Sequence, residues 1–93
     1  MIPRFLTLAV ELAGEGYEVF CACHGYPTGA GAWINLHGLT EAGAMGLALR
    51  FGGALTIEPQ EGVHQWTVTL PDGLRLYGCL CDAAGTPIRP VLQ

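Results

Sequence analysis

The sequence predicts an α+β fold, in which an antiparallel sheet of about five to six strands carries one helix on one face. Three observations predict it: short segments of alternating apolar residues, two tight-turn sequences, and one capped helical segment at about 41–51. The 93 residues, 51% hydrophobic and 13% charged, suit a single domain with one core across 1–93.

The first element is predicted as a β-hairpin, with strands at 5–12 and 17–24 joined by a turn that contains Gly14. This register makes one face of the hairpin apolar throughout, which favours it. It also brings the carboxylates of Glu11 and Glu18 directly opposite each other. The apolar face would consist of Leu6, Leu8, Val10, Val19, Cys21 and Cys23.

A helix over residues 4–13 is the alternative for the first of these strands. Arg4, Thr7 and Glu11 fall on one helical stripe, and Gly14 would end such a helix well. Short segments of this kind fit both periods, so the choice between strand and helix stays open.

The middle of the chain is predicted as a glycine-rich loop at 25–31, a strand at 32–37 and the helix at about 41–51. Thr40 has the residue type of an N-cap, Arg50 stands in the last turn, and Gly52 follows the helix. Along the strand, Ile34 and Leu36 should point one way and Trp33, Asn35 and His37 the other.

The C-terminal third is predicted as a short strand at 54–58, which Pro59 stops, followed by a hairpin around the turn 70–74. Beyond Asp82, residues 83–93 read as a turn and an extended tail that contains two prolines. One face of the hairpin would carry Trp66, Val68, Leu70, Leu74, Leu76 and Leu80.

The charge pattern argues against several partner classes. Eight carboxylates stand against four arginines, with no lysine, so a surface that follows nucleic-acid phosphates lacks its cations. No apolar run is long enough to span a bilayer, and the apolar stretch after Arg4 is interrupted by Glu11 and lacks a cleavage site. We therefore expect no nucleic acid and no membrane, a cytoplasmic location, and reduced cysteines.

The cysteines form two Cys-x-Cys pairs, Cys21 with Cys23 and Cys79 with Cys81. A zinc site built from Cys79, Cys81 and His24 is a weak alternative. Its weakness is the spacing, because side chains two residues apart on a strand stand further apart than two sulfurs on one zinc ion. Strand parity also places the two pairs on opposite sheet faces. We expect no metal and no cofactor.

Catalysis is not expected either. The chain contains no serine, no glycine-framed nucleophile and no run of backbone donors typical of an oxyanion hole. A cysteine nucleophile would need a histidine that nothing in the sequence positions.

A partner-binding surface is the remaining candidate site. The outward sheet face would carry Phe20, Trp33, Tyr77 and Arg75, which are residue types enriched at protein interfaces. The opposed Glu11 and Glu18 could hold a cationic side chain of the partner. A second small core on this face, covered by the tail and the 25–31 loop, is the alternative.

The sequence thus predicts a small acidic, non-catalytic protein-binding module, an inhibitor or adaptor that acts on a larger protein with a basic surface. Phage-encoded antagonists of bacterial defence, anti-CRISPR proteins included, are such modules and would work in the host cytoplasm, although no motif identifies that class. The alternative is a self-associating domain, for example a homodimer, that binds a small ligand or a metal through Cys and His.

Overall fold

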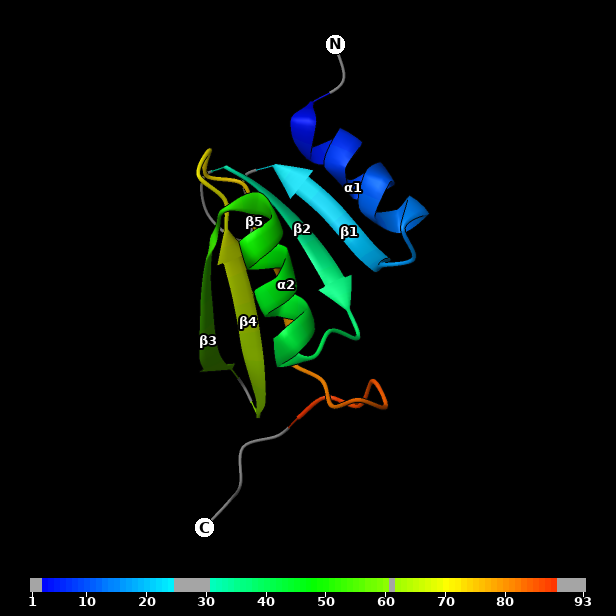
Figure 1. Ribbon diagram of the computed structural model, residues 1–93, viewed down its shortest axis with the longest axis vertical. Helices are drawn as coiled ribbons and strands as arrows, with labels where there is room; N and C mark the ends of the chain where they lie inside the picture. Colours follow the sequence, from blue (N-terminus) through cyan, green and yellow to red (C-terminus); the bar gives the residue numbers. More distant parts are fainter. Residues whose placement is uncertain (1–2, 25–30, 61, 89–93) are drawn as a thin grey trace.

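The computed structural model describes residues 3–24, 31–60 and 62–88, and these form two helices and five strands (Figure 1). The α+β class predicted from the sequence is confirmed. The predicted loop at 25–31 lies outside the described residues except for Gly31. The elements are α1 (Arg4–Gly14), β1 (Glu18–His24), β2 (Ala32–His37), α2 (Glu41–Phe51), β3 (Ala54–Gln60), β4 (Val63–Thr69) and β5 (Arg75–Cys79).

The five strands make one mixed sheet in the order β1-β2-β5-β4-β3. Three of the four neighbouring pairs are antiparallel, whereas β2 and β5 run parallel, so the prediction of an entirely antiparallel sheet is wrong at that pair. The cause is the connection through α2, which carries the chain from β2 to the far edge. The turns β3–β4–β5 then bring β5 back beside β2.

The N-terminal segment is the helix α1, so the preferred prediction of a strand at 5–12 is wrong and the alternative helix is right. Its apolar residues Leu8, Ala9 and Leu12 are buried in the core at helical spacing. Ion pairs hold it at both ends: Arg4 meets Asp72 at 2.6 Å, and Arg50 meets Glu15 at 2.6 Å. These partners lie far away in the sequence, which explains why local pattern alone did not decide the element.

The helix α2 has the predicted bounds and the predicted caps. The Thr40 hydroxyl accepts a hydrogen bond from the Gly43 N–H at 3.1 Å, and Gly52 ends the helix with a left-handed φ of 66°. The β4–β5 hairpin is also confirmed, with Trp66 opposite Gly78 and Val68 opposite Leu76. Local sequence signals therefore determine both elements.

The strand β3 continues to Gln60, although Pro59 was predicted to stop it. Pro59 pairs with His64 in the antiparallel ladder with β4. Because proline has no N–H, this must be a pair without hydrogen bonds, with the Pro59 nitrogen facing the free edge of the sheet. An edge strand tolerates proline in this orientation.

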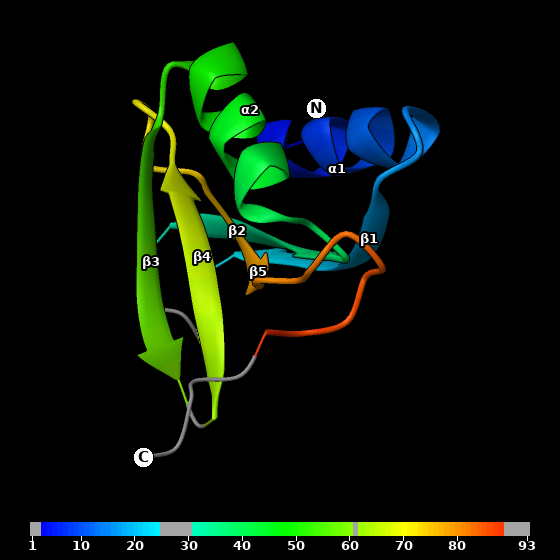
Figure 2. The ribbon, with the colours of Figure 1, turned by 60° about the horizontal axis from the view of Figure 1, so that its bottom comes forward.

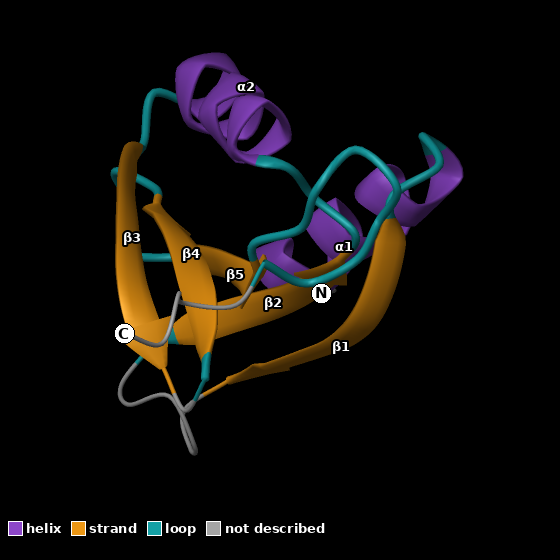
Figure 3. Ribbon diagram, turned by 90° about the horizontal axis from the view of Figure 1, so that it is seen from below, coloured by secondary structure: helices purple, strands orange, loops and turns teal. Residues whose placement is uncertain are grey.

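Both helices pack on the same side of a strongly curled sheet (Figure 3), and α2 lies beside the β3–β4 hairpin, which crosses the β1–β2 pair steeply (Figure 2). One core joins both helices to the sheet. Its largest fully buried side chains are Trp66, Leu12, Ile34, Leu36, Leu47, Leu76 and Val68. Neither described helix covers the opposite face of the sheet.

The segment after β5 folds back on itself before residue 88. The Asp82 side chain accepts hydrogen bonds from the Ala84 and Thr86 N–H groups, which forms a tight turn. The Ile88 N–H then donates to the Leu80 carbonyl at 2.8 Å. The first half of the predicted tail is thus attached to the end of β5, and residues 89–93 lie outside the described part.

Candidate functional site

The candidate site is the sheet face opposite the helices, which we call the outer face. Strand parity and register assign its side chains. They are Glu18, Phe20, Cys21 and Cys23 on β1, Trp33, Asn35 and His37 on β2, Arg75, Tyr77 and Cys79 on β5, Gln65, Thr67 and Thr69 on β4, and Thr56 and Glu58 on β3. Four of the predicted partner-binding aromatic and arginine residues are therefore together on one face: Phe20, Trp33, Tyr77 and Arg75.

A β-bulge in β1 decides which residues of that strand face outward. Val19 lies opposite Leu36 and Cys21 lies opposite Asn35, so Phe20 is the extra residue between them. Without the bulge, Cys21 would follow Val19 to the helix side. The bulge instead places Phe20 and Cys21 on the outer face together.

Two aromatic pairs organise the outer face. The rings of Phe20 and His37 are stacked, with centroids 4.8 Å apart and planes 13° from parallel. The rings of Trp33 and Tyr77 meet edge to face at 5.4 Å. Phe20 is 68% exposed, so its ring can contact a partner directly. Trp33 is only 4% exposed, so its ring is covered by its neighbours and supports the face from within.

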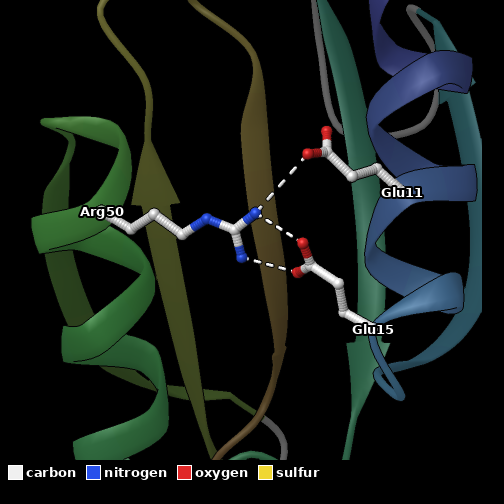
Figure 4. A network of polar contacts seen from close by, with 3 residues as sticks. All are labelled: Glu11, Glu15 and Arg50. Atoms are coloured by element: carbon white, nitrogen blue, oxygen red, sulfur yellow. Dashed lines mark hydrogen bonds and ion pairs between the residues drawn. The ribbon is translucent and has the colours of Figure 1, made fainter.

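Glu11 does not belong to this face, and its predicted position opposite Glu18 is wrong, because residues 4–14 are helical. Arg50 of α2 reaches across to α1, where its two terminal nitrogens donate to the Glu15 carboxylate at 2.6 and 2.8 Å (Figure 4). Glu11 lies 3.6 Å from the same guanidinium. Glu11 thus helps to join the helices, and the hydrogen bonds from Arg50 lower the pKa of Glu15.

Glu18 remains on the outer face, at the edge strand β1. It lies opposite His37 in the ladder, with its Oε1 4.0 Å from the histidine Nδ1. Glu58 lies on the other edge strand, β3, and pairs with Gln65, which pairs with Cys79. The parallel register Asn35–Tyr77, extended by two residues, brings Cys79 beside His37, so Glu18 and Glu58 stand at the two ends of one cross-strand row. Sequence reasoning missed Glu58, although its alternation with Ile57 along the strand would have placed it outward.

The cysteines are distributed differently from the prediction. Cys21, Cys23 and Cys79 share the outer face, so the expectation that Cys21 and Cys23 point toward the helices is wrong, and the bulge is the reason. All four cysteines are free thiols in the structure. Burial, which disfavours the charged thiolate, raises the pKa of Cys21 and of Cys81, and the neighbouring Cys23 raises that of Cys21 further.

The weak metal alternative required Cys79, Cys81 and His24 to converge. His24 ends β1 on the helix side, where its ring lies 6.2 Å from that of Phe5. Cys79 and Cys81 instead line a hollow with His37 near the Gly85 turn. Within the part of the chain that the structure describes, no group of three or more His, Cys, Asp or Glu side chains is arranged to hold a metal ion.

The two edge strands of the sheet each carry a feature that disfavours pairing with another chain. The bulge at Phe20 interrupts the regular backbone of β1. Pro59 removes one outward N–H from the free edge of β3, and Glu58 adds a charge beside it. Strand addition at either edge is therefore less favourable than contact across the face.

Asn35, at the centre of the outer face, has an unusual environment. Its Oδ1 is buried and has no hydrogen-bond partner among the described residues. An unpaired buried acceptor costs about 1–3 kcal/mol, so this side chain is not optimised for stability. The sequence offered no signal for this beyond an amide among alternating apolar residues.

Neither described helix is long and apolar enough to cross a bilayer. No protein-family model, no curated protein and no solved structure matches this chain.

Proposed function

We propose that this chain is a small, non-catalytic protein-binding module that docks on a larger protein through its outer face, as an inhibitor or an adaptor does. The observation that carries the proposal is the exposed ring of Phe20, held by His37 on a sheet face that neither described helix covers. Aromatic residues and arginine are enriched at protein interfaces, and Arg75 lies on the same face as Phe20.

The stacking of Phe20 on His37 supports this role energetically. A side chain that is already ordered loses little conformational entropy when a partner covers it. Its 68% exposure leaves most of the ring available to be buried. On the same face, the edge-to-face contact between buried Trp33 and half-buried Tyr77 gives the surface a second ordered aromatic pair.

The partner approaches the face and not an edge. The bulge in β1 and Pro59 in β3 both disfavour the addition of a strand, and the same features disfavour a homodimer formed by edge pairing. The formal charge of −4, with Glu18 and Glu58 at the two edges of the face, suits a partner that is basic around its contact site. A direct nucleic-acid ligand does not fit this charge.

A comparative capture experiment from the source cell tests the proposal. The baits are the wild-type protein, Phe20→Ala, and Leu49→Ala as the matched control. Leu49 is 77% exposed on α2, so it is at least as exposed as Phe20 while lying on the helix side. Captured proteins are quantified by mass spectrometry.

We expect at least one larger protein on the wild-type and Leu49→Ala baits, depleted by roughly tenfold or more on Phe20→Ala, because an aromatic side chain that anchors an interface contributes about 2 kcal/mol or more. Equal capture by all three baits would place binding elsewhere. Capture of no protein by the wild-type chain would count against a binding module of any kind.

A further inference from the structure

A small hollow lies within the outer face, over three adjacent strands. Its volume is about 50 Å³, and it is lined by Trp33 of β2, Arg75 and Tyr77 of β5, and Gln65 and Thr67 of β4. A space of this size suits one small planar group. The edge-to-face rings of Trp33 and Tyr77 contribute an aromatic wall.

The polar groups of the hollow are mainly hydrogen-bond donors. The Gln65 Nε2 donates to the Thr67 Oγ1 at 3.4 Å, which leaves the hydroxyl hydrogen of Thr67 for another acceptor. The guanidinium of Arg75 carries five N–H donors, so it can bind an incoming acceptor beside the contacts that it makes within the fold. None of the described residues that line the hollow is a carboxylate.

The charges of the outer face are separated along the strands. Arg75 lies in the row of Trp33, whereas Glu18 and Glu58 lie in the row of His37 and Cys79. Arg75 and Cys79 are four residues apart on β5, so the two rows are about 13 Å apart. Arg75 is therefore toward one end of the face, the two carboxylates are toward the other, and the hollow extends between them as far as Gln65, the partner of Glu58.

We infer that the hollow is a subsite for an aspartate or glutamate side chain of the protein partner, whose cationic side chains face Glu18 and Glu58. This inference rests on the proposed function. A carboxylate is planar, it matches the fork of a guanidinium, and its aliphatic stem fits against an aromatic wall. The two ends of the face thus set the orientation in which the partner docks.

A polyanion is a poorer occupant than a single carboxylate. The face carries carboxylates at the end opposite Arg75, and the whole chain has a formal charge of −4, so an extended row of phosphates would meet repulsion beyond the hollow. A single acidic side chain flanked by basic ones avoids that repulsion.

The test is a titration followed by ¹H–¹⁵N NMR, with two probes that differ only in charge. The first is N-acetyl-glutamate amide, which presents a carboxylate, and the second is N-acetyl-glutamine amide, its neutral isostere. The resonances to follow are the Trp33 indole N–H, the Arg75 Nε–H and the Thr67 backbone N–H. Spectra of Arg75→Gln and of the control Glu58→Gln report folding and binding together.

We expect saturable shifts at these resonances with the glutamate probe, none with the glutamine probe, a loss of roughly tenfold or more in affinity for Arg75→Gln, and no loss for Glu58→Gln. Equal shifts with both probes, or unchanged binding by a folded Arg75→Gln, would overturn the inference. Arg75→Gln is also used as a capture bait: if it keeps a partner that Phe20→Ala loses, the proposed function stands and the carboxylate subsite fails.

Discussion

Gly78 provides the sharpest test of how closely the central strands approach. It lies on β5 opposite Trp66, and a Cβ added there would overlap the backbone carbonyl oxygen of Leu36 and stand 3.2 Å from the Trp66 Nε1. Overpacking costs about 1–3 kcal/mol, and a backbone obstacle favours the upper end. Alanine also lowers the conformational entropy of the unfolded chain, which offsets about 0.4–1 kcal/mol of this loss of stability. We therefore expect Gly78→Ala to lose about 2 kcal/mol.

The assay is urea denaturation followed by tryptophan fluorescence, with Gly46→Ala as the control. Gly46 lies in α2, where an added Cβ meets nothing within 4 Å, so alanine should stabilise the protein by about 0.5–1 kcal/mol. The same substitution should thus act with opposite signs at the two positions. If Gly78→Ala is as stable as the wild type, the close approach of β5 to β2 is wrong.

Three further outcomes follow from individual side chains. Asn35→Val should raise the free energy of unfolding by about 1 kcal/mol in the same urea assay, because it removes an unpaired buried acceptor. A lower free energy of unfolding would mean that the Asn35 Oδ1 has a hydrogen-bond partner in the folded protein. The hydrogen bonds from Arg50 lower the pKa of Glu15 from its ordinary value, so the stability advantage of the wild type over Glu15→Gln should be present at neutral pH. This advantage should disappear as the pH falls through the lowered pKa, and a gap that persists in acid contradicts the pairing. With iodoacetamide and mass spectrometry, exposed Cys79 should react well before Cys81, which is buried and has a raised pKa; the reverse order would place Cys81 at the surface.

The elements that could be predicted from the sequence are those whose signals are local. The helix α2 has its cap at Thr40 and its left-handed end at Gly52, within a single segment. The β4–β5 turn depends on Asp72, whose side chain accepts from the Leu74 N–H, and on Gly73 with its φ of 92°. Each of these residues contributes its effect without help from distant parts of the chain.

The helix α1 was mispredicted because the deciding interactions are distant. Its apolar residues fit a strand as well as a helix, and the turn to β1 fits both. The choice depends on the core that Leu12 enters and on Arg50, which is 35 residues from Glu15. The parallel pairing of β5 with β2 is of the same kind, since it results from the path of the whole chain.

The candidate site was partly predictable for a similar reason. Parity along β2 and β5 placed Trp33, Tyr77 and Arg75 on one face, and the structure agrees. The bulge at Phe20 has no glycine or other sequence mark, yet it moves Cys21 from one face to the other. The hollow over three strands could not be predicted at all, because it depends on the strand order.

A partner that docks as proposed covers the outer face, and hydroxyl-radical footprinting of the captured complex detects which face is covered. Phe20 is 68% exposed on the outer face and Met45 is 45% exposed on α2, so both should be oxidised in the free protein. We expect the partner to protect Phe20 and Tyr77 while the oxidation of Met45 stays unchanged. Protection of Met45 with continued oxidation of Phe20 would contradict it.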